Sequence, residues 1–270
     1  SRMHGIVITN KKKFKHYSIS YVHPEKNYSY QSAIPLYIEI NPYSKVVLHE
    51  LFFNDAVAKI FKFVYVVREG ASLIINRSYS TRGLIENKER KAKLQAHVVE
   101  SNIIQHPGST LKVITNGERN NYLQDLYFLT AYEETSTEIV GRYHATETDS
   151  VHVITDVNHI APNSTSNVDV KCVADGTSRF TFAGNINVSK EATGVDANLQ
   201  NKNLQLSDKA VVITEPKLDI KTKEIACKHG CTVSSIDPDK MYLLNTKGID
   251  AENAKRILKE SFLSYSREHV

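Results

Sequence analysis

The chain has 270 residues, of which 41% are hydrophobic and 24% charged, and its formal net charge at pH 7 is +4. A chain of this size can bury a substantial core, as one large domain or two ordinary ones. The charge is too small and too scattered for a surface that binds nucleic-acid phosphates. No run approaches the ~18 apolar residues of a membrane helix. Three cysteines, an odd number, indicate a reducing compartment rather than a disulfide framework. We therefore expect neither nucleic acid nor a membrane as a partner.

The first part of the chain has the pattern of β-strands. Short runs rich in β-branched and aromatic residues are expected to be strands at 5–9, 17–22, 34–40, 46–53, 61–67 and 71–76. The turn signal Asn41-Pro42-Tyr43-Ser44 separates two of them. The charged stretch 83–97 is expected to be a loop or a short helix.

From residue 97 to 236 the sequence is nearly all β in pattern. Strands are expected at 96–104, 110–115, 126–132, 138–144, 151–157, 168–173, 179–182, 186–188, 203–206, 211–214, 218–220 and 225–233. Turns rich in Gly, Asn, Asp or Ser separate them, and no helical crossover intervenes, which excludes a doubly wound α/β fold. No strict repeat is visible. The pattern therefore leaves a sandwich, a barrel and a solenoid open.

The stretch Cys227-Lys228-His229-Gly230-Cys231 holds two of the three cysteines, near the end of this β region. In a strand Cys227, His229 and Cys231 would share one face. Cys227 and Cys231 would then stand roughly 13 Å apart, too far for one zinc ion unless Gly230 forms a bulge. Two interpretations stay open: a row of metal-binding or nucleophilic groups, or a buried strand end whose cysteines pack as hydrophobic residues.

The end of the chain has the pattern of two short helices. Asp237 is a good N-cap with Pro238 at the first helical position, and Gly248 suits the residue after the helix. Asp250 can cap a second helix. That helix carries an apolar stripe of Ala254, Ile257, Leu258 and Phe262. The stripe can pack on the core or dock a partner.

Other catalytic or metal-binding motifs are absent from the sequence. The remaining histidines are scattered, and none belongs to an H-E-x-x-H zinc motif. There is no phosphate-binding loop, no dinucleotide fingerprint and no nucleophile elbow. Cys172 is expected to be a buried thiol, and Glu133-Glu134 a solvated loop. We therefore expect no self-contained hydrolase or transferase.

Several motifs, in order over residues 156–263, resemble the SufB/SufD family of iron–sulfur cluster assembly proteins. Residues 227–233 resemble the family signature C-S-H-G-A-T-V. Similar partial matches occur at 158–164, 182–186, 203–207, 214–220 and 236–249. The resemblance implies a mainly β fold, with a right-handed parallel β-helix core over 1–236 and a helical segment over 237–270. The N-terminal helical domain of full-length SufD-like members has no counterpart here.

The resemblance also favours a SufD-like member over a SufB-like scaffold. SufB-type sequences have a glutamate after this histidine and a cysteine 29 residues before that glutamate; Gly230 and Asn201 stand at these positions. Cys231 replaces the family alanine, and Lys247 the family arginine. The resemblance also implies that His229, Cys227 and Cys231 lie near the site of cluster assembly. Iron or a nascent cluster would bind there transiently, chiefly at His229, with no stably bound cofactor.

The implied function is that of a non-enzymatic subunit that assists iron entry and cluster formation. It would pair with a SufB-like scaffold and a SufC-like ATPase in the cytoplasm, or in an organelle of a eukaryote, and form a homodimer in isolation. The ATPase would dock on Met241, Leu244, Ile257, Leu258 and Phe262. The alternatives are a SufB-like scaffold, a β-solenoid that binds or acts on carbohydrate, and a purely structural dimer partner.

Overall fold

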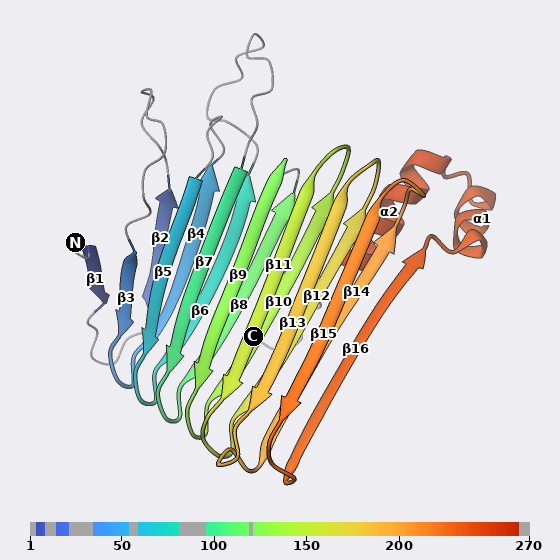
Figure 1. The fold of residues 1–270 in the computed structure, drawn as a ribbon. Coiled ribbons are helices and arrows are strands. Elements are labelled where there is room, and N and C mark those ends of the chain that lie inside the picture. Colours follow the sequence, from blue (N-terminus) through green and yellow to red (C-terminus); the bar gives the residue numbers. More distant parts are fainter. Residues whose placement is uncertain are drawn as a thin grey trace.

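The structure, a computed structural model, describes residues 4–8, 15–21, 35–53, 59–80, 96–118 and 121–264. In these ranges the chain forms two parallel sheets of eight strands each, followed by two helices (Figure 1). The first sheet contains β1 (His4–Ile8), β3 (Leu36–Ile40), β5 (Lys59–Val67), β7 (Ala96–Gln105), β9 (Tyr122–Ala131), β11 (Ser150–His159), β13 (Arg179–Val188) and β15 (Val211–Ile220). The second contains β2 (Lys15–Tyr21), β4 (Lys45–Phe53), β6 (Ser72–Ser80), β8 (Thr110–Glu118), β10 (Ser136–Ala145), β12 (Thr165–Ala174), β14 (Val195–Gln205) and β16 (Ile225–Ser235).

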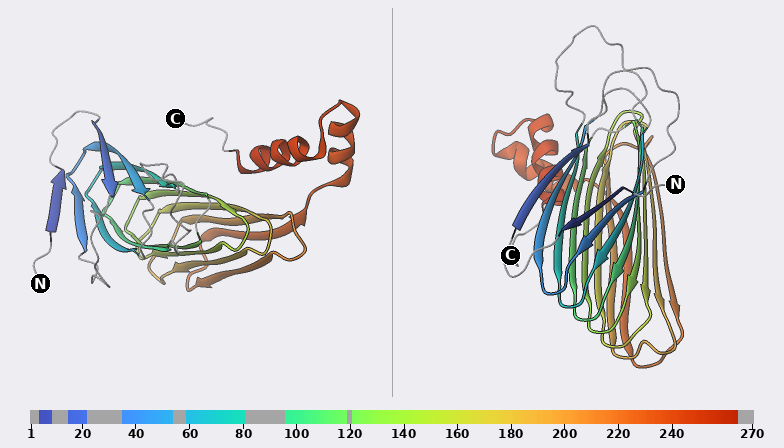
Figure 2. Two further views of the ribbon diagram at one scale, coloured as in Figure 1. Left: turned by 90° about the horizontal axis from the view of Figure 1, so that it is seen from above. Right: turned by 90° about the vertical axis from the view of Figure 1, so that its left-hand side faces the viewer.

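The chain winds as a solenoid, with odd strands in one wall and even strands in the other (Figure 2). Each strand pairs in parallel with the strands one turn before and after it, as in the register Ser136, Thr165, Asp196 along β10, β12 and β14. Parallel strands need long crossovers, and here the opposite wall supplies them. The prediction of a parallel β-helix core is confirmed.

The turns from odd to even strands are stacked as regularly as the strands. Each of the six from the β3–β4 turn to the β13–β14 turn has one residue in the left-handed region: Tyr43, Gly70, Gly108, Glu134, Asn163 and Gly194. Backbone hydrogen bonds link each turn to the next, for example from Gly108 N to Glu133 O at 3.1 Å and from Glu134 N to Pro162 O at 3.1 Å. The turns therefore continue the hydrogen-bond ladders of the sheets around the corner of the solenoid.

The core lies between the two walls, because alternate residues of every strand point inward. Along β11 and β13 the residues with 0% exposure, such as Val157, Phe180 and Phe182, alternate with half-buried ones. Cys172 on β12 is also fully buried, as expected, and burial raises the pKa of its thiol. Most of the interior is thus a stack of apolar layers along the axis.

One layer of this interior is charged. Arg77 on β6 donates from Nε to Glu50 Oε2 at 2.9 Å and from Nη1 to Asp125 Oδ1 at 3.2 Å, and all three side chains are fully buried. Asp125 also accepts from the hydroxyls of Tyr79 at 3.0 Å and Tyr143 at 2.7 Å. Removing one partner of such a buried pair typically costs ~3–5 kcal/mol, because the other charge is left uncompensated. Loss of any one of these charged side chains should therefore destabilise the fold.

Several expected strand boundaries in the C-terminal half differ from the structure. The separate strands expected at 179–182 and 186–188 are one strand, β13, and those at 211–214 and 218–220 are one strand, β15, which runs through Pro216. Proline is tolerated there because β15 is an edge strand. The strand expected at 203–206 begins already at Val195. Most of 83–97 lies outside the described residues.

The two helices are α1 (Pro238–Thr246) and α2 (Ala251–Leu263). The predicted caps are confirmed: Asp237 accepts from Asp239 N, and Asp250 accepts from Asn253 N at 2.9 Å. The helix α2 lies against β12, where Lys171 Nζ donates to Phe262 O at 3.0 Å. This cation satisfies a carbonyl at the negative end of the helix dipole. Within the described ranges no helix is long and apolar enough to span a membrane.

Candidate functional site

The cysteine–histidine row lies on β16, the last strand of the even wall. β16 pairs with β14, whose side chains Ala197, Leu199 and Asn201 lie in the interior and are only 0–1% exposed. In that register Cys227 pairs with Ala197, His229 with Leu199 and Cys231 with Asn201. The three side chains of the row therefore share one face, and that face continues the inner surface of the solenoid.

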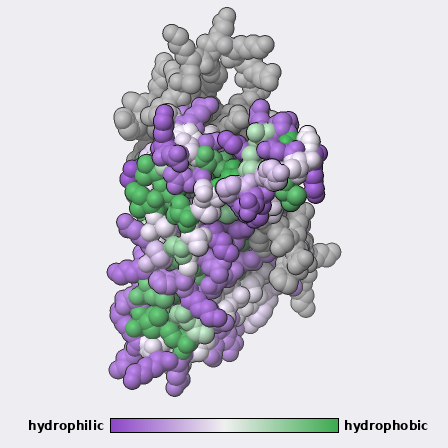
Figure 3. Space-filling view, turned by 90° about the vertical axis from the view of Figure 1, so that its right-hand side faces the viewer, coloured by the Kyte–Doolittle hydropathy of each residue, from purple (hydrophilic) through white to green (hydrophobic). Residues whose placement is uncertain are grey.

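No later turn of the described chain covers this inner surface. β15 and β16 are the last strands of their sheets, and both lie at one end of the solenoid (Figure 1). Large apolar side chains are exposed there, including Val233 at 47% and Ile220 at 38%. Figure 3 looks onto this end and shows hydrophobic groups among hydrophilic ones. The core thus ends in an open face, which we call the open end and define by β15 and β16.

Cys227 is the member of the row that still belongs to the core. Its side chain is half-buried and packs against the core cluster, as Ile225 does. Burial raises the pKa of the Cys227 thiol, and the Asp196 carboxylate adds to the rise. At neutral pH this thiol is therefore held in its protonated, hydrophobic form, which suits packing better than metal binding.

His229 is the accessible member of the row. His229 is exposed, and Cys231 is half-buried with its Sγ 3.1 Å from Thr214 Oγ1 on β15. Gly230 points to the opposite, outer face of β16, where a Cβ built on it would have no neighbour within 4 Å. β16 is continuous through Gly230, so no turn folds the row back on itself. Cys227 and Cys231 thus remain at strand spacing, too far apart to share one ion.

A buried amide pair beneath the row was not predicted from the sequence. Asn201 and Asn203 are fully buried on β14, and Asn203 Nδ2 donates to Asn201 Oδ1 at 2.6 Å. Asn201 Nδ2 donates to Val170 O at 3.1 Å, and Asn203 Nδ2 reaches Thr232 O at 3.3 Å. The signal in the sequence that could have indicated this pair is the two-residue spacing of Asn201 and Asn203, which places both side chains on one face of a strand. The pair supports the inner wall of the open end.

The described residues contain no cluster of three or more His, Cys, Asp or Glu side chains able to hold a metal ion. Imidazole and thiolate are nevertheless suitable donors for iron, and two of them face the same way at the open end. The described residues alone therefore offer fewer donors than a complete metal site needs.

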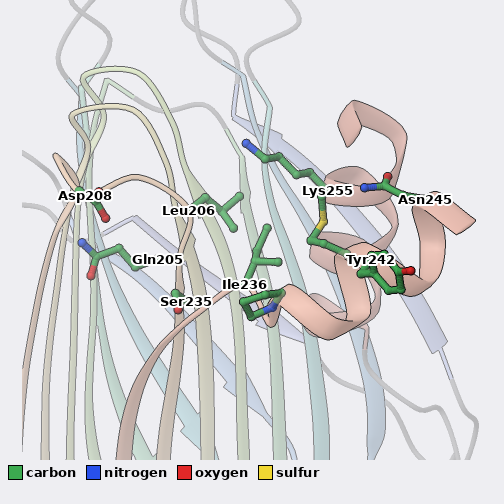
Figure 4. Close-up of a pocket in the computed structure, with 10 residues that line it drawn as sticks. Gln205, Leu206, Asp208, Ser235, Ile236, Tyr242, Asn245 and Lys255 are labelled. Carbon is green, nitrogen blue, oxygen red and sulfur yellow. The ribbon is translucent and has the colours of Figure 1, made fainter. Parts of the chain in front are cut away.

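The helical tail forms a groove with the last turns of the solenoid, with a volume of about 510 Å³ (Figure 4). Tyr242, Asn245 and Lys255 come from the helices, whereas Leu206 and Asp208 come from the segment between β14 and β15. Both apolar and polar side chains line the groove. It separates α1 from the solenoid wall.

The residues expected to dock an ATPase all lie on this tail. Met241, Leu244, Ile257, Leu258 and Phe262 are each half-buried. The large apolar residues of α1 that face solvent are Tyr242, 71% exposed, and Leu243, 55% exposed. Neither was singled out in the sequence, because the pattern of α1 has no clear apolar face. The expected docking residues are therefore less exposed than Tyr242 and Leu243, and their role stays a prediction.

Comparison with known proteins finds relatives of this chain among iron–sulfur cluster assembly proteins. A SufBD family iron–sulfur cluster assembly protein of Synechocystis sp. is 30% identical over 126 residues, 47% of this chain and 26% of that protein. The iron–sulfur cluster assembly protein SufD of Escherichia coli is 33% identical over 92 residues, 34% of this chain and 22% of that protein. SufD of Bacillus subtilis is 24% identical over 227 residues, 83% of this chain and 47% of that protein. The chain therefore spans less than half the length of each of these relatives.

The family itself is matched over most of the chain. Residues 43–262 match the family described as SUF system FeS cluster assembly, SufBD core domain. The match covers the strands from β4 onward and nearly all of the helical tail. The chain therefore belongs to the SufBD core domain family of the SUF system for iron–sulfur cluster assembly.

Proposed function

We propose that this chain is a SufD-like, non-enzymatic subunit of an iron–sulfur cluster assembly complex. Family membership and the SufD relatives support a role in cluster assembly. The observation that carries the finer proposal is the open end, where His229 and Cys231 face out of an uncovered core. Iron or a nascent cluster is the cargo of this site, and the chain contributes ligands rather than turnover.

The open end is suited to pairing with a second subunit of similar fold. β16 is an edge strand of eleven residues, and its neighbour across the core, β15, carries Pro216, which lacks an N–H to donate. β16 is therefore the better edge for an added strand. A SufB-like scaffold seated there would cover Val233 and bring its own donors toward His229.

The helical tail is the part we assign to a SufC-like ATPase. It projects beyond the last strand of the solenoid (Figure 2), and it exposes Leu243 and also Tyr242, which lines the groove. Exposed aromatic and aliphatic groups on a helix are common anchors of protein interfaces. The sequence has no phosphate-binding loop, so nucleotide hydrolysis would belong to the partner.

Co-expression with a SufB-like scaffold and a SufC-like ATPase, followed by anaerobic purification, tests this function. We expect the three proteins to copurify with iron and acid-labile sulfide, and the complex to show charge-transfer absorption in the visible range. The chain alone should hydrolyse no ATP. Purification of the chain free of both partners, from cells that contain all three, would contradict the proposal.

A further inference from the structure

We propose that His16 on β2 and His49 on β4 form a binding site for one divalent metal ion that prefers nitrogen ligands, such as copper or zinc. The site lies at the end of the even wall opposite β16, and His16 lies outside the residues 43–262 that match the family (Figure 1). It therefore does not depend on the function proposed for the open end. The bound ion would join β2 to its neighbour in the sheet.

Both histidines lie on the outer face of the even wall. Tyr17 of β2 packs against the core and Leu48 of β4 is fully buried. Side chains alternate along a strand, so His16 and His49 point away from the core. His16 pairs in register with Val47, which makes His49 its diagonal neighbour, two residues further along β4. Diagonal neighbours on one face of a sheet are within reach of side chains as long as an imidazole.

The two imidazole rings meet edge to edge. His16 Nδ1 lies 3.4 Å from His49 Nε2, the ring centroids are 5.7 Å apart, and the ring planes differ by 12°. The centroid separation exceeds the nitrogen separation by about the width of an imidazole ring, so both nitrogens lie between the centroids. Each ring therefore directs one nitrogen at the other ring.

The separation of these nitrogens fits a shared ion. Nitrogen ligands lie ~2.0–2.1 Å from zinc, so two of them at neighbouring corners of a tetrahedron stand roughly 3.3–3.4 Å apart. The observed 3.4 Å matches this spacing but is long for a hydrogen bond. A bound ion takes the place of the hydrogen between the rings, and the ring that donated it carries its hydrogen on the other nitrogen instead. Small rotations about χ2 aim both lone pairs at the ion.

Two imidazoles supply only part of a coordination sphere. Among the described residues no third His, Cys, Asp or Glu completes a metal-binding group with them. His16 is exposed, so water can fill the remaining positions. We therefore expect an exchangeable site rather than a closed structural one. Copper should bind more tightly than zinc, in the usual order of the divalent ions.

The ion would hold the edge of the sheet together. β2 is the end strand of the described even sheet and pairs there with β4. Strands at such an edge open locally more easily than inner strands. A ligand that binds only the closed arrangement stabilises it. Amide hydrogen exchange across residues 15–21 should therefore slow when the metal binds.

Copper(II) held by nitrilotriacetate is the probe, because the chelate leaves only neighbouring coordination positions open and so selects paired imidazoles over single ones. The full chain without an affinity tag is titrated at neutral pH. We expect one copper chelate per chain at saturation, with nitrogen splitting from both imidazoles in electron paramagnetic resonance. His16→Ala and His49→Ala should each weaken binding at least tenfold, because a chelating pair loses its advantage with either ligand. The double variant should bind about as weakly as either single variant.

His152→Ala is the matched control. His152 is a half-buried imidazole on the outer face of the odd wall, where its Nε2 lies 3.0 Å from Ser150 Oγ and its ring centroid 5.5 Å from that of Tyr122. It is a single imidazole with no histidine partner among these contacts. Its removal should leave copper binding unchanged.

Thermal unfolding and circular dichroism establish that each variant is folded, and His49→Gln replaces His49→Ala if the alanine variant is not. Saturable copper binding that persists in both single variants, that disappears in His152→Ala, or that never forms in the wild-type chain overturns the site. Hydrogen exchange across residues 15–21 that does not slow on copper binding would show that the ion does not bridge β2 and β4, and overturns it as well.

Discussion

At the residue scale, the buried ring of His159 sets how the solenoid responds to acid. Its Nδ1 lies 2.7 Å from Ser164 Oγ and its Nε2 lies 2.9 Å from Ser166 Oγ, with 1% of the residue exposed. Burial lowers the pKa of His159 from 6.5 to about 4. The ring is therefore neutral in the folded protein at pH values where the unfolded chain would already hold the proton.

This difference predicts a loss of stability between pH 6.5 and pH 4. Below pH 6.5 the unfolded state takes up the proton first, so the free energy of unfolding falls as the pH decreases, until the folded ring is also protonated near pH 4. The total loss from this group is about 3 kcal/mol, at ~1.4 kcal/mol per pKa unit. Denaturant titrations at pH 8 and pH 4.5 measure it.

The control for this prediction is His159→Gln, which keeps hydrogen-bonding groups near both serines without a titratable ring. The variant should be less stable than the wild type at pH 8 but should lose less stability on acidification. Equal losses in the two proteins would mean that His159 does not control the acid response.

At the scale of elements, the exposed residues of α1 are expected to anchor the ATPase, whereas α2 holds the tail on the solenoid. Tyr242→Ala with Leu243→Ala should weaken binding of a SufC-like ATPase at least tenfold, because both side chains are exposed and free to enter a partner pocket. The thermal unfolding temperature should not change. Calorimetric titration of the ATPase into the chain measures the affinity.

Phe262→Ala, on α2, is the variant to compare with the two substitutions on α1. Phe262 lies over Lys171 Nζ, 5.5 Å from the ring centroid, so its removal should loosen α2 and speed amide hydrogen exchange across residues 251–263. An ATPase affinity that is lowered by Phe262→Ala but not by the α1 substitutions would show that the docking surface lies on α2 instead.

The helices and the caps were predictable because their signals are local. Asp237, Pro238 and Asp250 act on backbone groups within three residues, so no knowledge of the fold is needed. The expected strand began only at Asn203, and the part of β14 before it was missed because Asn201 looks like a turn residue in the sequence. Asn201 and Asn203 are buried with their amides paired to each other and to neighbouring turns of the solenoid.

At the scale of the whole molecule, the open end is expected to make the isolated chain a dimer. Wild-type chain should be dimeric in light scattering at high micromolar concentration, with β16 and its exposed Val233 in the interface. Val233→Glu should shift it to monomer, since a buried unpaired carboxylate is costly. Ile60→Glu, at a similarly exposed position on β5, should remain dimeric. A monomeric wild type, or a dimeric Val233→Glu, would contradict this.

The solenoid as a whole was predictable only in part. Strand alternation indicated an all-β fold, but successive turns begin at Thr110, Ser136, Thr165 and Asp196, and this unequal spacing hides the repeat. Alternation also placed His229 and Cys231 on one face. That this face is the inner one depends on the register of β16 on β14, and the strand pattern does not contain that information.

The central claim is that the open end of this chain takes part in cluster assembly through His229. The most direct test is the iron and acid-labile sulfide content of the anaerobically purified complex carrying His229→Ala, measured beside the wild type and Cys227→Ala. We predict that His229→Ala forms the complex with unchanged thermal stability but holds at least fivefold less cluster, whereas Cys227→Ala holds nearly the wild-type amount. A stable His229→Ala complex with normal cluster content would contradict the account.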